Sequence, residues 1–394
     1  SPDHAVTVDP LLAKKIEIIQ GPSTLLYGAG TVGGLVNVTD SKIPTQMPEN
    51  GYEGNVGLRY NTGSDEKLAS AGVTVGLGDQ VALRVEGLKR EANDYIAPDY
   101  FHEGEKERRV DNTFAKGQTV NVGLSWIYDR CFTGISYSNR QDQYGLPGHS
   151  HEYESCTVSG NLLIGCGEED YGDEHETGPW VDLKSERYDF RTEILNPIAG
   201  FEKLRAHASY TDYQHDEIEG DSVATTFKSK GYDARLEMVH QPIADWEGVV
   251  GVQYNQQKLD ITGEESILEP TKTQKWSVFG LEHKQWNDFH FELGSRVDHQ
   301  TIDIESDRKD YDDYAVSYSG AVNWMFAPNY KLSLVGSHQE RLPLAQELYA
   351  DGKHLATNTY ERGNENLDVE KSNNLELGFH YDTDKIDYHV HVYH

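Results

Sequence analysis

The sequence predicts an all-β protein, a transmembrane antiparallel β-barrel, and three observations support this prediction. From residue 52 onward, apolar and polar residues alternate with a period of two, as in strands that face lipid on one side and a polar lumen on the other. The 37 glycines and 24 tyrosines, against only three methionines, are typical of strands, turns and aromatic girdles. The third observation is that the connections between these segments differ greatly in length.

Charge and composition exclude several other classes of protein. The 35 Lys and Arg residues against 66 Asp and Glu residues give a formal net charge of -31, which repels phosphate backbones and excludes sequence-independent nucleic-acid binding. No run of apolar residues is long enough for a spanning helix, whereas an alternating barrel needs none. No Ser/His/Asp grouping, pair of catalytic carboxylates or phosphate loop stands out, so we expect no enzyme activity.

The alternation defines the individual strands. In Tyr52–Asn61 the residues Tyr52, Val56, Leu58 and Tyr60 share one face, and polar residues occupy the other. The pattern recurs in segments 69–77, 120–128, 188–194, 204–210, 232–238, 289–297, 330–334, 375–381 and 388–392. We therefore expect roughly fifteen strands, many of them long enough to cross a bilayer at a tilt.

The connections favour an outer-membrane barrel over a soluble β-sandwich or propeller, which would also alternate. Connections such as 78–80 and 327–329 are short, whereas 93–118, 144–184 and 338–371 are long and polar. Short turns on one rim and long loops on the other are typical of outer-membrane barrels. The sequence also lacks the repeat period of a propeller.

The first 48 residues follow a different pattern. Residues 14–20 (KKIEIIQ) predict a strand, which is followed by Gly21-Pro22, a short helical piece at 23–26, a glycine cluster and a second strand at 35–38. The cluster consists of Gly28, Gly30, Gly33 and Gly34. A nucleotide-binding interpretation of GAGTVGG is weak, because its first glycine follows a helical piece and not a strand.

Segment 16–44 (IEIIQGPSTLLYGAGTVGGLVNVTDSKIP) closely resembles the end of the plug domain of TonB-dependent outer-membrane receptors. The resemblance implies a barrel of 22 strands with an N-terminal plug domain inside its lumen. Residues 1–48 would be the C-terminal part of the plug, and residues 49–394 a partial, incomplete barrel with long extracellular loops. It also implies a monomer in the lipid bilayer of the bacterial outer membrane. The TonB energy-coupling complex would be its partner, through a segment that this sequence does not contain.

Within that family, segments 1–9, 142–156, 179–191, 213–221 and 337–359 resemble zinc-uptake receptors in collinear order. The resemblance implies import of zinc through a primary site that combines a plug pair with two residues of barrel loops. These ligands are Asp3, His4, Glu217 and His354. Two imidazoles and two carboxylates suit zinc, and the carboxylates offset its charge. His215 neighbours Glu217 and is an auxiliary candidate, although each residue taken alone is more often an exposed polar loop residue.

The loop at 144–184 carries His149, His151 and His175 among many carboxylates. Two interpretations stay open, namely peripheral capture of divalent metal ions at the mouth and a solvated acidic loop. Cys156 and Cys166 lie close together in this loop, and we expect them to form a disulfide in an oxidising compartment. We expect Cys131 to be a small buried apolar residue. Three reduced thiols are the alternative.

Haem uptake is the alternative function. Arg341-Leu342-Pro343 and the segment 364–367 resemble degraded forms of two boxes of haem receptors in the same family, with His354 between them. His4 and His354 would then be axial ligands of haem. Asp3 and Glu217 favour zinc, because ferric haem needs no further oxygen ligands. A passive adhesin or porin is disfavoured by the plug-like segment. We expect His389 and His391 to line the lumen, and assign no role to His380.

Overall fold

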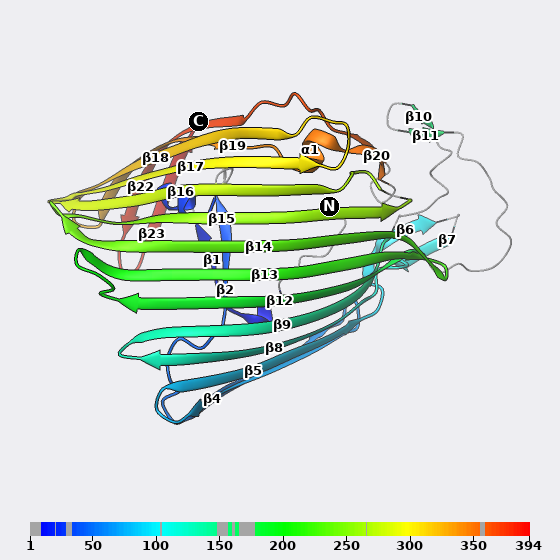
Figure 1. The fold of residues 1–394 in the computed structure, drawn as a ribbon, viewed down its shortest axis with the longest axis horizontal. Coiled ribbons are helices and arrows are strands. Elements are labelled where there is room, and N and C mark those ends of the chain that lie inside the picture. The colour runs from blue at the N-terminus through cyan, green and yellow to red at the C-terminus, as the bar shows by residue number, and fades with distance from the viewer. Residues whose placement is uncertain are drawn as a thin grey trace.

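A computed structural model confirms the all-β prediction. It describes residues 9–19, 21–28, 34–102, 105–147, 157–159, 162–164, 178–264, 266–354 and 359–394. Fifteen antiparallel strands form one curved sheet, in the order β3-β4-β5-β8-β9-β12 and then β13 to β19, β22 and β23 (Figure 1). Strands β3 and β23 are the two edges of this sheet. The count of roughly fifteen strands expected from the alternation is thereby confirmed.

The strands of the sheet are β3 (Tyr52–Asn61), β4 (Glu66–Leu77), β5 (Val81–Ala92), β8 (Ala115–Tyr128), β9 (Cys131–Gly145), β12 (Trp180–Leu195), β13 (Phe201–Glu219), β14 (Ser222–Ile243), β15 (Trp246–Gly263), β16 (Thr271–Trp286), β17 (Phe289–Ile304), β18 (Tyr311–Ala327), β19 (Tyr330–Arg341), β22 (Glu370–Asp382) and β23 (Asp387–Tyr393). Most are longer than the alternation predicted, because backbone pairing continues into polar residues near the strand ends.

The sheet exposes apolar side chains and buries charged ones, the reverse of the arrangement in soluble proteins. On β17, Leu293 and Val297 are exposed on the outer face, whereas Arg296 and Asp298 are buried on the inner face. The buried pair is satisfied by its own ion pair, with Arg296 Nε 3.0 Å from Asp298 Oδ1. An apolar outer face and a charged inner face are what a strand needs between lipid and a polar lumen. No helix in the described ranges has the length and apolar character required to cross a membrane.

The connections divide the sheet into two rims. Turns of two to five residues join the strands at the short-turn rim, which comprises residues 78–80, 129–130, 196–200, 244–245, 287–288, 328–329 and 383–386. Asp129-Arg130 and Ala244-Asp245 all have positive φ, as two-residue type I′ hairpin turns require. The long-loop rim holds the long connections 93–114, 146–179 and 342–369, but also the shorter ones 62–65, 220–221, 264–270 and 305–310. The predicted inequality of the connections is therefore confirmed, with the exception of these four.

The long-loop rim carries further short elements. They are β6 (Ile96–His102), β7 (Glu105–Arg109), β10 (Thr157–Ser159), β11 (Leu162–Ile164), α1 (Ala345–Tyr349), β20 (Asp351–His354) and β21 (Thr359–Arg362). Helix α1 packs its Leu348 and Tyr349 into an apolar cluster at this rim. This mouth cluster consists of Ile261, Ile267, Leu268, Ile302, Ile304, Leu348 and Tyr349. The cluster fixes the long loop 342–369 against the tops of the strands.

The N-terminal segment (residues 9–48) lies within the curve of the sheet (Figure 1). It contains η1 (Pro10–Leu12), β1 (Ala13–Ile19), η2 (Pro22–Leu26) and β2 (Leu35–Asp40), and β1 pairs with β2. The two predicted strands and the helical piece between them are confirmed. Segment η2 packs against β16, β17 and β18. Gly30 and Gly33 of the glycine cluster lie outside the described residues.

Two local contacts bear on the sequence predictions. A side chain at Gly123 on β8 would meet the carbonyl oxygen of Lys42 in the N-terminal segment, so glycine permits this close approach. Cys131 is buried, and its sulfur accepts a hydrogen bond of 3.3 Å from the Leu195 backbone N–H, which confirms it as a small core residue. Cys156 and Cys166 lie outside the described residues, so their predicted disulfide stays a prediction.

Candidate functional site

His215 and Glu217 lie side by side on β13 close to the long-loop rim. They are two residues apart on one strand, so both point to the same face. Each is only 3% exposed, and His215 Nε2 is 3.9 Å from Glu217 Oε1. We expected Glu217 in a loop, but it belongs to the strand ladder and pairs with Val181 and Thr225. Its carboxylate is therefore held by a rigid element.

Aromatic neighbours fix the His215 ring. Its Nδ1 lies 2.9 Å from the hydroxyl oxygen of Tyr213, and the ring stacks on Phe227 with a centroid distance of 4.3 Å. Tyr213 packs against a second apolar cluster that includes Val181 and Leu183. Phe227 packs against the mouth cluster. With one nitrogen held by Tyr213 and the ring stacked on Phe227, the orientation of the other nitrogen is defined.

His354 is the last residue of β20, in the connection 342–369 on the long-loop rim. It is 7% exposed, and its Nδ1 is 3.2 Å from Glu361 Oε1 on the paired strand β21. The hairpin is attached to the mouth cluster, because the Asp351 backbone N–H donates a hydrogen bond of 2.8 Å to the Ile267 carbonyl. Phe227, which stacks on His215, packs against the same cluster. The structure thus ties two of the predicted ligand regions, from β13 and β20, to one apolar support.

The other predicted site residues lie outside the part of the chain that the structure describes. Asp3 and His4, the plug pair of the primary zinc site, lie outside the described residues. The same is true of the loop histidines His149, His151 and His175. The complete four-ligand zinc site and the peripheral capture site therefore stay predictions. Of the predicted set, Glu217, His354 and the auxiliary His215 are described.

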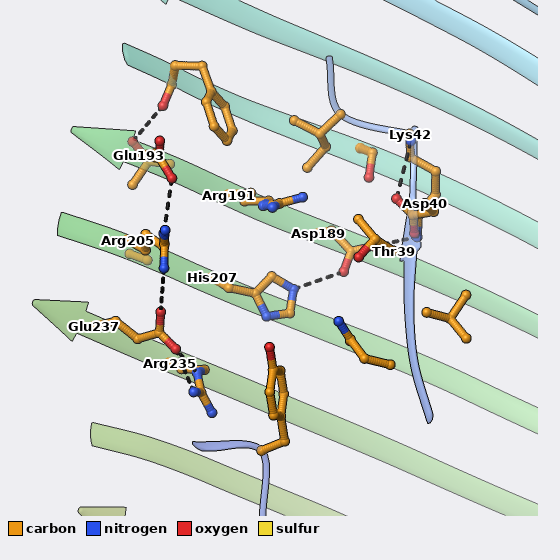
Figure 2. A pocket seen from close by; sticks show the side chains of 18 of the residues that line it. Thr39, Asp40, Lys42, Asp189, Arg191, Glu193, Arg205, His207, Arg235 and Glu237 are labelled. Carbon is orange, nitrogen blue, oxygen red and sulfur yellow. Dashed lines mark hydrogen bonds and ion pairs between the residues drawn. The ribbon is translucent and has the colours of Figure 1, made fainter. Parts of the chain in front are cut away.

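A cavity of about 540 Å³ separates the N-terminal segment from strands β12 to β14 (Figure 2). Its wall is charged. Arg205 lies between Glu193 and Glu237, with N–O distances of 3.0 and 3.6 Å, and His207 Nε2 is 3.3 Å from Asp189 Oδ1. The sequence predictions did not treat these residues as a site, although the alternation of charged residues along β12 and β13 could have indicated one.

The N-terminal segment touches the inner face of the sheet through polar contacts. Lys42 Nζ is 3.0 Å from Asp189 Oδ2, and Arg296 donates a hydrogen bond of 3.3 Å to the Leu25 carbonyl. Water can replace such partners when two surfaces separate, whereas separated apolar surfaces would remain exposed. These two contacts are therefore of a kind that water can replace.

The short-turn rim holds a further histidine group that the sequence predictions did not treat as a site. His380, His389 and His391 place one ring nitrogen each within 4.8 Å of the others. The sequence spacing of His389 and His391 already indicated that they share a strand face. The missing information was the strand register, which sets His380 directly opposite His389.

Known proteins share this architecture. The family described as TonB dependent receptor-like, beta-barrel, matches residues 50–394. The chain is 23% identical over 387 residues to the iron-regulated outer membrane virulence protein of Vibrio cholerae serotype O1, a match that covers 95% of this chain and 51% of that protein. The chain thus spans about half the length of this curated relative.

Two solved structures resemble the fold. The copper transporter OprC superposes with a TM-score of 0.73 at 15% identity, covering 98% of this chain and 58% of that one. The FrpB iron transporter from Neisseria meningitidis superposes with a TM-score of 0.73 at 13% identity, covering 99% and 62%. At such identities the likeness shows the fold, whereas the family match spans most of the sequence. The chain lies in the bacterial outer membrane and belongs to the TonB-dependent receptor-like β-barrel family.

Proposed function

We propose that the chain is part of an outer-membrane receptor that binds zinc at the long-loop rim and imports it. In this proposal residues 1–48 are the C-terminal part of the plug, and residues 49–394 form part of the barrel wall. The observation that carries the proposal is the buried pair of His215 and Glu217, whose side chains approach within 3.9 Å. Two tetrahedral zinc ligands at 2.0–2.2 Å lie about 3.5 Å apart, so a small shift would bring both onto one ion.

The surroundings of this pair suit a cation. If His215 Nδ1 donates its proton to the Tyr213 oxygen, Nε2 keeps the lone pair that a metal ion requires. His354 would add a second imidazole from the hairpin on the mouth cluster. Asp3 and His4 would complete the ligand set from the plug, as the resemblance to zinc-uptake receptors implies. The carboxylates of Asp3 and Glu217 would then balance the double positive charge.

The names of the similar proteins support a metal-containing substrate in general. They mention iron and copper, and none of the three mentions zinc. Zinc is our choice because the described donors are imidazole and carboxylate, which zinc accepts readily. Copper prefers the same imidazoles and often binds more tightly, so selectivity has to be measured with both ions.

Haem is less well supported by the geometry. An axial ligand must present one ring nitrogen toward a wide, largely apolar slot. His354 is 7% exposed and its ring faces Glu361 within the β20–β21 hairpin. Haem could reach this residue only if the hairpin left the mouth cluster. The two hypotheses are separated by a titration with haem, since ligation would shift the Soret absorbance.

Uptake through a plugged barrel requires that the plug move. We propose that the TonB energy-coupling complex moves the N-terminal segment away from β12, separating Lys42 from Asp189. The cavity beside this contact is lined by charged side chains and would hydrate as the segment leaves (Figure 2). Ligands contributed by both plug and wall would then part, and the ion would be released toward the short-turn rim.

Calorimetric titration of the full-length receptor with zinc tests the proposal. We expect Glu217→Ala and His354→Ala each to weaken zinc binding at least tenfold, about 1.4 kcal/mol. Asp216→Ala is the matched control, because this neighbouring carboxylate belongs to the opposite face and pairs with Gln214 and Thr226. Equal zinc affinity in all variants would remove both residues from the site. A Soret shift with haem, without heat from zinc, would favour haem uptake.

A further inference from the structure

The opposite end of the lumen carries three histidines on β22 and β23, next to the turn at 383–386. His380 and His389 are direct cross-strand partners, and His391 opposes Gly378, two residues further along the same face. The alternate residues Leu377 and Val390 are exposed on the outer face. The three imidazoles, named here the rim histidines, therefore project together into the lumen.

The rim histidines are close enough to share one ion. One ring nitrogen of each lies within 4.8 Å of the others, and the His380 ring meets the rings of His389 and His391 at centroid distances of 4.6 and 4.9 Å. Gly378 makes room for them. A Cβ atom there would lie 3.1 Å from His380 Nε2 and 3.2 Å from the His391 ring, so a side chain would force these rings to shift.

His380 has a feature that packing alone leaves unexplained. It is 8% exposed, and its Nε2 is 3.3 Å from the hydroxyl oxygen of Ser333. Its Nδ1 is buried and has no hydrogen-bond partner within the described part of the chain. A buried polar atom without a partner costs about 1–3 kcal/mol, so a ligand that engages this nitrogen would recover that cost.

Carboxylates orient the other two rings. His391 Nδ1 is 2.6 Å from Glu376 Oε1, while His389 Nε2 is 2.8 Å from Asp382 Oδ1 and 2.6 Å from Asp387 Oδ1. A ring nitrogen that donates its proton to a carboxylate leaves the lone pair on the other nitrogen. This is the arrangement that supports histidine ligands of metal ions, because it fixes the tautomer and increases ligand basicity.

We propose that His380, His389 and His391 form a second site, for a divalent cation of the zinc type, at the short-turn rim. Three imidazoles with a fourth position open to water form a common zinc coordination. The carboxylates of Glu376, Asp382 and Asp387 supply negative charge around it. Binding of the cation does not depend on the function proposed above. Only a role as the final binding site of an imported ion would rest on that function.

Cobalt(II) alone serves as the probe, because its visible absorption reports tetrahedral coordination. The background is the full-length receptor in detergent with Glu217→Ala and His354→Ala, which removes the site proposed at the long-loop rim. We expect this variant to retain a cobalt band, and the further changes His389→Ala and His391→Ala to abolish it. The matched control is His299→Ala, which removes a histidine paired with one carboxylate, Asp312, at 2.9 Å. We expect it to leave the band unchanged.

The outcomes separate the two proposals. Loss of all cobalt binding in the Glu217→Ala, His354→Ala background, or a band that survives loss of His389 and His391, would overturn the rim site. An equal loss with His299→Ala would do the same. Full cobalt and zinc binding by the background variant, lost only with the rim histidines, would overturn the long-loop site instead. His389→Gln with His391→Gln, checked for barrel folding by mobility of unheated samples in electrophoresis, repeats the test with minimal change in volume.

Discussion

The two ends of the lumen carry similar side chains in different surroundings. At the long-loop rim, His215, Glu217 and His354 are nearly buried, and His215 stacks on Phe227, which packs against the mouth cluster. At the short-turn rim, the side chains of His389 and His391 are 44% and 39% exposed and paired with carboxylates. Electrostatic interactions are stronger away from water and are screened in it. The first site is therefore better shielded from water than His389 and His391, which lie on the edge strand β23.

The lengths of the connections also differ between the two ends. Strands β13 and β14, with 19 and 22 residues, extend the wall at the long-loop rim, and helix α1 packs there against the mouth cluster. The turn beside the rim histidines has only four residues, 383–386. Of these histidines, His380 on β22 is buried, whereas His389 and His391 lie on the edge strand β23. We expect the two ends to be energetically independent.

Removing the support of the mouth has the largest expected effect. Leu348 is buried in the mouth cluster, and Leu348→Ala should cost about 2–5 kcal/mol of local stability. We expect zinc binding at the long-loop rim to weaken more than tenfold and amide exchange in β20 to accelerate, while the cobalt band of the rim histidines stays unchanged. Leu344→Ala, an exposed position before the same helix, is the control. A loss of cobalt binding at the rim histidines would show that the two ends are coupled.

Most of the fold could be predicted from the sequence, because lipid and lumen impose opposite chemistry on alternate residues. On β17, for example, Leu293 and Val297 are exposed, whereas Arg296 and Asp298 are buried. The ends of the strands could not be predicted in this way. Beyond the bilayer both faces of a strand can be polar, as in the part of β13 that contains Glu217, and pairing there depends on backbone hydrogen bonds. Glu217 was expected in a loop because the resemblance to zinc-uptake receptors implied a loop glutamate at this position.

The sites were predictable only where sequence spacing determines geometry. His215 and Glu217 are neighbours because residues two apart on a strand share a face. The position of His354 depends on attachment of the β20–β21 hairpin to the mouth cluster, which no local pattern encodes. The pairing of His380 with His389 depends on the register set by the 383–386 turn. The first depends on residues far apart in the sequence, and the second on the register of one hairpin.

Loss of one hydrogen bond at the long-loop rim should have an intermediate effect. Tyr213→Phe removes the hydroxyl group that lies 2.9 Å from His215 Nδ1 and leaves the aromatic ring in place. We expect zinc affinity to fall by about 1 kcal/mol, roughly fivefold, because the imidazole loses an orienting partner. Tyr210→Phe is the control, since its hydroxyl pairs with Asp212 on the other face of β13. Calorimetry that finds equal affinity in Tyr213→Phe and wild type would remove His215 from the ligand set.

The smallest expected effect is a pH dependence confined to the mouth. Hydrogen bonds from Arg341 and from the Leu344 backbone N–H hold the pKa of Glu347 below its usual value. A lowered pKa in the folded state stabilises α1 above the ordinary pKa of a glutamate, and this contribution is lost as the pH falls through the folded value. We expect amide exchange in 345–349 of the metal-free protein to show added opening below about pH 4.5. Glu347→Gln, compared at each pH, should lack this added opening. Identical pH profiles for the two proteins would show that Glu347 does not couple α1 to pH, and added opening near the rim histidines would contradict the independence of the two ends.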